Sequence, residues 1–124
     1  MMRDMNLMRL LMLELEKIEI PGGGTVSMSD VGEALPIEGY TADQVRYHFR
    51  LIAEDSGWIV GGTKRFSRIT AAGHDFLDAV RDEDIWRMTR EGALQVKGFT
   101  TDLLIDLAKG YLKNRIRQFT NIEI

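Results

Sequence analysis

Apolar side chains recur every three or four positions in several stretches of the chain, which is the pattern of helices that bury one face. The first stretch follows Asp4, which can cap a helix, and it ends where Pro21 opens a glycine-rich loop over residues 21–27. Its apolar positions are Leu7, Met8, Leu11, Met12, Leu15 and Ile18. Because these residues cover a wide face, we expect the helix to lie between other elements.

Two further helices are predicted before residue 57. A short helix occupies the stretch SDVGEAL, with Ser29 or Asp30 as its cap. A longer helix begins after Thr41, which has Gln44 three residues later as in a capping box, and it ends at Gly57. The apolar face of the longer helix consists of Val45, His48, Phe49 and Ile52. This position predicts that the histidine belongs to the core.

A β-hairpin is predicted directly after this helix. Residues 58–60, Trp-Ile-Val, have the composition of a strand, and residues 65–69 can return as its partner. The tight turn is either Gly61-Gly62 or Gly62-Thr63. Because a lone hairpin is marginal in water, we expect its strands to pack on the helices.

The remaining chain is predicted to be helical. Thr70 caps one helix, and Asp84 can cap a new start after a break near residue 81. Residues 92–98 form a short connector, and Thr100 or Thr101 begins the last helix. The apolar positions of the last helix are Leu104, Leu107, Ala108, Tyr111, Leu112 and Ile116.

This order of elements predicts an α+β, mostly helical protein. The expected core is a winged helix-turn-helix of three helices and a two-strand β-hairpin wing, with additional C-terminal helices. We expect the winged-helix domain to cover residues 1–92. Residues 93–124 then form the connector and the last helix, which packs on the same domain, against the first helix, or on a dimer partner.

The composition is typical of a soluble globular protein, with 124 residues, 44% of them hydrophobic and 28% charged. Charged residues interrupt the first apolar stretch, which predicts that it neither spans a bilayer nor acts as a secretion signal. The absence of cysteine excludes disulfides and zinc-thiolate sites and fits a reducing compartment. We therefore expect a cytoplasmic protein without membrane contact.

The net charge of -3 argues against a generic polyanion binder, but the charge is uneven along the chain. Residues 41–70 carry five basic and three acidic side chains, and residues 71–92 carry three basic and six acidic ones. Residues 109–124 carry four basic side chains and one acidic one. Two mildly basic regions flank an acidic one, which permits a local contact with nucleic acid and equally permits self-association.

In a winged helix, the helix over residues 42–55 would be the recognition helix. Burial of its apolar face turns polar and basic side chains toward solvent, and these are the types that contact phosphates and base edges in a major groove. The predicted DNA-contacting residues are Gln44, Arg46, Tyr47, Arg50, Lys64, Arg65 and Arg68. Of these residues, Arg46 and Arg50 are expected to share one exposed surface with Lys64 and Arg65 at the tip of the wing. The alternative is a solvated helix face and a hairpin kept soluble by its charges.

A second cluster, after the wing, combines polar and aromatic side chains: His74, Asp78, Asp82 and Trp86. It is either a salt-bridged helix junction or a docking surface for a partner protein or a second copy of the chain. No metal site is expected, because the two histidines lack HxxxH or HxxEH spacing and the acidic residues lack the pattern of a calcium loop. No nucleophile motif or phosphate-binding loop appears, so we expect neither an enzyme nor a cofactor.

Three segments resemble a known family: RDMNLMRLLMLELEKIE at 3–19, VRYHFRLIAEDSGWI at 45–59 and ITAAGHDFLDAVRDEDIWRM at 69–88. The chain is similar, over nearly its whole length including the last helix, to an uncharacterised bacterial and phage family, domain of unknown function 2513. The Tyr47-His48 pair and the run from Gly73 to Asp78 are the most specific parts of the likeness. The resemblance implies a winged-helix-like core, and it brings no established activity or catalytic residue.

The sequence thus predicts a small winged-helix protein that binds double-stranded DNA as a regulator or accessory factor and forms a homodimer. The alternative is a protein interaction module without nucleic-acid binding. The acidic balance of the chain and its long terminal helix favour that alternative.

Overall fold

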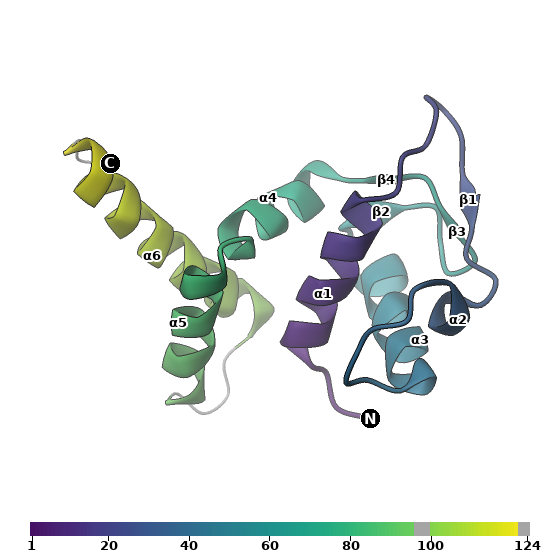
Figure 1. Cartoon of the computed structure of the whole chain (residues 1–124), viewed down its shortest axis with the longest axis horizontal. Helices are drawn as coiled ribbons and strands as arrows, with labels where there is room; N and C mark the ends of the chain where they lie inside the picture. Colours follow the sequence, from purple (N-terminus) through teal and green to yellow (C-terminus); the bar gives the residue numbers. More distant parts are fainter. Residues whose placement is uncertain (96–99, 122–124) are drawn as a thin grey trace. The chain divides into compact units, whose positions relative to one another are not determined.

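The computed structural model describes residues 1–95 and 100–121 (Figure 1). The protein is α+β and mostly helical, with two small two-stranded sheets and further helices toward its C-terminus. The chain divides into two compact units, Met1–Leu77 and Asp78–Ile124. This division falls within one helix and lies before the domain boundary expected from the sequence.

The first unit contains the helices α1 (Met5–Glu16), α2 (Val31–Ala34) and α3 (Ala42–Arg50), and α3 continues into a π-helical stretch, η1 (Leu51–Ser56). The predicted caps are confirmed: Asp4 accepts hydrogen bonds from the first backbone N–H groups of α1, and Thr41 forms a capping box with Gln44. Gly57 ends η1 with a φ of 73°. The sequence therefore marked both ends of the predicted recognition helix correctly.

His48 ties the start of α1 to α3, and its predicted place in the core is confirmed. The ring is 1% exposed, and its Nε2 accepts a hydrogen bond from the backbone N–H of Asp4 at 2.8 Å. Because Nε2 is the acceptor, the ring proton lies on Nδ1, which donates to the Gln44 carbonyl oxygen at 2.7 Å. Tyr40 adds a third contact, since its hydroxyl donates to the Asp4 carboxylate. These bonds fix the angle at which α3 presents its outer face.

The predicted hairpin forms in a modified way. Strand β2 (Ile59–Val60) pairs antiparallel with β4 (Arg68–Ile69), while β3 (Arg65–Phe66) pairs with β1 (Val26–Ser27). The expected return strand is thus divided at Ser67, and the prediction that residues 21–27 are only a loop is wrong for its last two residues. Pairing with β1 satisfies backbone groups of β3 that a lone hairpin would leave to water.

Helix α4 (Ala71–Val80) begins in the first unit, where its start packs closely on the strand segment. Thr70 caps it as predicted, because its hydroxyl oxygen accepts a hydrogen bond from the backbone N–H of Gly73. The rings of Trp58 and Phe76 stack with centroids 4.0 Å apart. A Cβ at Gly73 would lie 2.3 Å from the Trp58 carbonyl oxygen, so only glycine allows this approach.

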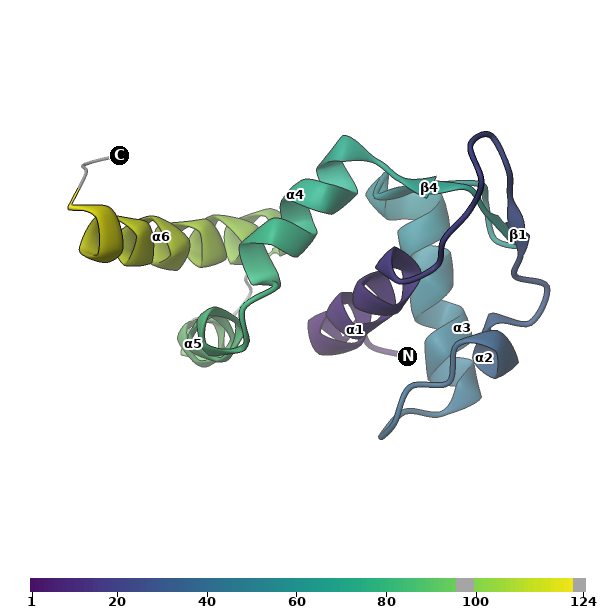
Figure 2. The same ribbon diagram turned by 45° about the horizontal axis from the view of Figure 1, so that its top comes forward.

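The second unit contains α5 (Glu83–Leu94) and α6 (Thr101–Thr120), which cross at a steep angle (Figure 2). Thr100 caps α6, in agreement with the sequence. The cap of α5 is Asp82 and not the predicted Asp84, because the Asp82 carboxylate accepts bonds from the N–H groups of residues 84 and 85. The predicted connector is wrong for residues 92–94, which are helical, and its residues 96–98 lie outside the described residues.

Two features hold α5 against α6. Gly92 lets the helices approach, since a Cβ there would lie 3.1 Å from Leu107 Cδ2 and 3.2 Å from the Tyr111 hydroxyl. An ion pair of 2.8 Å joins Arg115 to the same Asp82 carboxyl group that caps α5. The buried residues of this unit include Val80, Ile85, Trp86, Ala93, Leu104 and Ala108. Packing of the last helix on the first stays a prediction.

Candidate nucleic-acid interface

A groove of about 390 Å³ in the first unit brings the predicted recognition helix next to the turn after β2. Its lining residues come from the segment around α2, from α3 and η1, and from that turn. They are Met28, Ser29, Asp30, Val31, Arg46, Phe49, Arg50, Glu54, Thr63 and Lys64. Arg46, Arg50 and Lys64, three of the predicted DNA-contacting residues, therefore lie on one groove.

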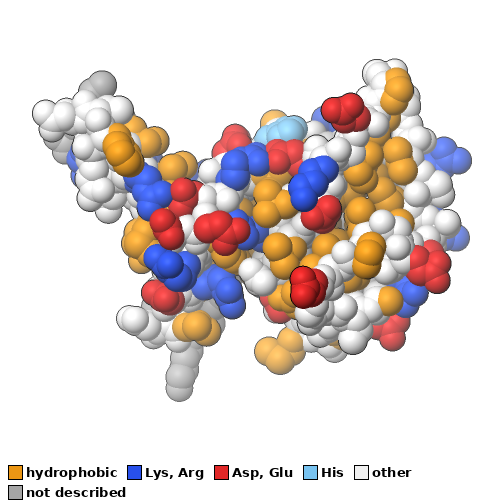
Figure 3. All heavy atoms as spheres, viewed as in Figure 1, with side chains coloured by type: hydrophobic (Ala, Val, Ile, Leu, Met, Phe, Trp, Pro, Cys, Tyr) orange, Lys and Arg blue, Asp and Glu red, His pale blue; other side chains and the backbone are white. Residues whose placement is uncertain are grey.

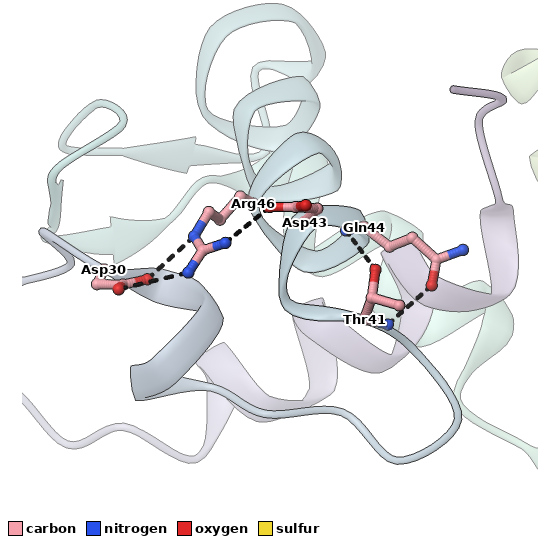
Figure 4. A network of polar contacts seen from close by, with 5 residues as sticks. All are labelled: Asp30, Thr41, Asp43, Gln44 and Arg46. Carbon is pink, nitrogen blue, oxygen red and sulfur yellow. Dashed lines mark hydrogen bonds and ion pairs between the residues drawn. The ribbon is translucent and has the colours of Figure 1, made fainter.

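Arg46 binds two carboxylates at once (Figure 4). Its Nε and Nη2 donate to the two oxygens of Asp30 at 3.1 and 3.4 Å, and its Nη1 donates to Asp43 at 2.8 Å. The bidentate pair links α3 to the start of α2. The sequence marks Asp30 only as a helix cap, because sixteen positions separate it from Arg46 and no local pattern connects them.

This pairing shifts both titrating groups. The hydrogen bond from Arg46, followed by its positive charge, lowers the pKa of the Asp30 carboxyl group below its ordinary value of 3.8. The same hydrogen bond raises the pKa of the Arg46 guanidinium, with a smaller effect from Asp43. Arg46 is still only partly covered, since 43% of its side chain is exposed. Exposed ion pairs contribute little to stability unless, as here, the arginine is bidentate or part of a network.

The other two cations of the groove are more accessible. Arg50 is paired with Glu54 one turn later at 3.4 Å, and 65% of its side chain is exposed. Lys64 is exposed, and its backbone carbonyl accepts a hydrogen bond from the backbone N–H of Met28 at 2.6 Å, which fixes the turn beside α2. The groove is thus lined by Arg46, which is held by two carboxylates, and by the more exposed Arg50 and Lys64.

The remaining predicted DNA contacts are distributed differently. Gln44 uses its side-chain oxygen in the capping box, and Tyr47 is half-buried with its ring edge-on to His48. Arg65 is exposed and donates to the Thr25 hydroxyl at 3.2 Å. Arg68 lines a separate hollow of about 200 Å³ together with residues that include Glu16 and His74. The expected common surface therefore contains Arg46, Arg50 and Lys64, and the groove lining does not include Arg65 or Arg68.

Acidic groups accompany each cluster of basic groups in the first unit. Asp30 and Glu54 line the groove with its three cations, and Asp43 lies just outside. In Figure 3, basic side chains lie at the edge of this unit beside β1 and β3, and acidic and basic side chains lie together near α2. Such a surface has a weak long-range field, so any polyanion must bind through close contacts with individual cations.

A family of uncharacterised proteins matches most of this chain. The family described as hypothetical protein (DUF2513) covers residues 2–100. The chain belongs to this family. DUF2513 membership confirms the likeness inferred from the three quoted segments, while the likeness expected for the last helix lies beyond the matched residues. No curated protein and no solved structure matches the chain.

In this DUF2513 member, the predicted docking cluster is divided between the two units. His74 belongs to the first unit, and Asp78, Asp82 and Trp86 belong to the second. Asp78 pairs with Arg81 at 3.3 Å, and Asp82 holds α5 and α6 as described above. Trp86 is 3% exposed, so its indole lies in the interior. A docking role for this set stays a prediction.

Metal sites and membrane spans are absent from the described ranges. No group of three or more histidine, aspartate and glutamate side chains within residues 1–95 and 100–121 is placed to hold a metal ion. None of the helices described is long and apolar enough to cross a membrane.

Proposed function

We propose that this DUF2513 protein binds double-stranded DNA through its first unit, which acts as a winged helix. The order α1, β1, α2, α3, β2 and the returning strands fits that architecture, in which the third helix enters the major groove and the wing contacts the backbone. The observation that carries the proposal is the groove where Arg50 of α3 and Lys64 of the turn lie together beside Arg46.

The three cations have different roles in this proposal. Arg46 is held by Asp30 and positions α3 on α2, so its contribution to DNA affinity is indirect. It contacts DNA directly only if a phosphate displaces one of its carboxylate partners. Arg50 and Lys64 supply the direct phosphate contacts because they are the more exposed. Binding is therefore weak in random sequence, and its dependence on salt is shallow, since few phosphates are neutralised.

The test is fluorescence anisotropy of a labelled duplex with the full chain, titrated at several salt concentrations. The double variant Arg50→Ala, Lys64→Ala should weaken binding about ten-fold at low salt, and it should reduce the slope of log K against log salt by about two. This double variant leaves the Asp30–Arg46 pair in place, so folding is expected to be unchanged.

The matched control removes the same amount of charge elsewhere. Lys17 and Arg87 are exposed and each pairs with an acidic residue on its own helix, so the double variant Lys17→Ala, Arg87→Ala has the same net charge as the test variant. It should bind DNA almost as the wild type does. Equal loss in both double variants, or no binding by the wild type at low salt, would contradict the proposal.

The second candidate is a protein interaction module without nucleic-acid binding. It is favoured by the pairing of both arginines in the groove with carboxylates, which leaves the surface nearly balanced in charge. Absence of DNA binding in the assay above would select this candidate. Capture experiments with the intact chain would then be the next step.

A further inference from the structure

Five of the six charged residues of α6 form one stripe in which like charges lie next to each other, and the sixth, Arg115, pairs with Asp82. Asp102 and Asp106 stand four positions apart in the first half of the helix, and Lys109, Lys113 and Arg117 follow at the same spacing in the second half. Like charges four residues apart destabilise an isolated helix. The helix macrodipole favours Asp102 and Arg117 but acts only within the terminal turns. The stability of α6 alone therefore does not account for the stripe.

An apolar and glycine strip runs beside this charged stripe. It contains Leu103, which is 56% exposed, Gly110, and the partly exposed Leu107, whose side chain also lies beside Gly92 of α5. A hollow of about 440 Å³ lies over it and is lined by Asp106, Leu107, Gly110, Tyr111, Lys113, Asn114 and Arg117. All these residues belong to α6, so the hollow is a depression along the helix itself.

Gly110 has no role in packing within the described chain. A Cβ at this position would meet no atom within 4 Å, in contrast to Gly92 on α5. Glycine inside a helix costs about 1 kcal/mol relative to alanine. A glycine on an exposed part of a helix instead allows the backbone of another helix to come close.

We propose that α6 pairs with α6 of a second copy of this chain, antiparallel and centred between Lys109 and Gly110. Asp106 and Lys113 are equally distant from this point on opposite sides, and so are Asp102 and Arg117. A two-fold axis there places each acidic residue beside the basic residue of the other copy. The contact is self-complementary, as in a closed dimer.

Asp106 and Lys113, the inner pair of opposite charges, are available for this pairing. In the described part of the chain, neither Asp106 nor Lys113 forms an ion pair. Most side chains in the outer half of the helix are also exposed, and α6 continues past its crossing with α5 (Figure 2). Lys109 is unfavourable in this arrangement, because the two-fold axis brings it near Lys109 of the other copy.

Analytical ultracentrifugation of the full chain over a wide concentration range tests this contact. The wild type should form a dimer, and Lys113→Glu should weaken the association about ten-fold because it places two acidic groups together. Asp106→Lys should have a similar effect. The double variant Asp106→Lys, Lys113→Glu should restore the dimer, since each new charge again meets its opposite in the other copy.

Two further variants separate this contact from a general effect of net charge or of helix stability. Lys109→Glu changes the net charge as Lys113→Glu does, but it lies at the axis and should not weaken the dimer. Gly110→Leu should weaken the dimer while circular dichroism shows full helicity. A monomer at all concentrations would overturn the proposal. Equal losses of dimer affinity in Lys109→Glu and Lys113→Glu would also overturn it. The same holds for a dimer that Phe119→Ser, at the exposed end of α6, disrupts and Lys113→Glu does not.

Discussion

Helices α3 and α6 carry similar charged side chains but arrange them in opposite ways. Along α3 and η1, residues of opposite sign stand three or four positions apart, as in Asp43 with Arg46 and Arg50 with Glu54, and they form ion pairs. Along α6, residues of the same sign have that spacing. The first arrangement neutralises itself within the chain, whereas in the proposed dimer the second meets opposite charges of the other copy. Charge order along a helix is therefore as informative as net charge.

The largest expected effect on stability comes from two glycines: Gly73, which is packed against the chain, and Gly110, which is exposed. Gly73→Ala should lower the free energy of unfolding by about 3 kcal/mol, because its Cβ would overlap the Trp58 carbonyl oxygen. At protein concentrations low enough for the monomer, Gly110→Ala should instead raise it by about 1 kcal/mol, because alanine favours the helix and meets no atom of the same chain. Urea unfolding of both variants measures the difference. Equal destabilisation by both substitutions would show that the face around Gly110 is packed.

A second prediction concerns the inner face of α3. His48→Ala should cost about 2 to 4 kcal/mol, because it opens a cavity in place of a buried ring and leaves the partly buried N–H of Asp4 without its acceptor. Tyr40→Phe removes a partly buried hydroxyl that donates to Asp4 and accepts from the Asn6 side chain, and it should cost about 1 kcal/mol. Thermal and urea unfolding give both values. A His48 variant no less stable than the Tyr40 variant would show that α1 and α3 are not joined through this ring.

A third prediction concerns the DNA affinity of variants that lack a carboxylate paired with Arg46 or Arg50. Glu54→Gln and Asp30→Asn each remove a carboxylate beside the groove, so each should raise DNA affinity a few-fold at low salt, about three-fold for one charge. Glu14→Gln is the control, since Glu14 pairs with Lys17 on α1. Anisotropy titrations compare the three. Affinity raised equally by the control would assign the gain to net charge and not to the groove.

The smallest expected effect is the acid response of the second unit. The hydrogen bond from the Ile85 backbone N–H, together with Arg115, lowers the pKa of Asp82 below its ordinary value of 3.8. A lowered pKa in the folded state means that Asp82 stabilises the fold above pH 3.8 and loses this contribution as the pH falls through the lowered value. The stability difference between wild type and Asp82→Asn should therefore shrink below about pH 4. A difference independent of pH would contradict this assignment.

The helices and their caps could be predicted because their signals are local. Asp4, Thr41 with Gln44, Gly57 and Thr100 each act on backbone groups within a few residues, and all four assignments are confirmed. The family was recognised for a similar reason, since its motifs are contiguous in the chain. The core position of His48 followed from helical spacing alone.

The features that the sequence does not reveal depend on partners far along the chain. Strand β1 has only two residues, follows three glycines, and is defined by its pairing with β3 about forty residues later. Asp30 gave the signal of a helix cap, yet its side chain binds Arg46. Asp82 and Asp84 are both suitable caps for α5; Asp82 is the cap, and it also pairs with Arg115 on another helix, a contact that the local sequence does not indicate. Local propensity contains no information about such contacts.

The most direct test of the DNA-binding proposal is a ¹H–¹⁵N NMR titration of the full chain with a short duplex, because it compares α3 and α6 in one experiment. The amide signals that shift with added DNA should belong to α3, η1 and the turn at residues 61–64. The signals of α6 should stay where they are in the DNA-free protein. Shifts concentrated in residues 101–120, or no shifts at low salt, would contradict DNA binding through the groove.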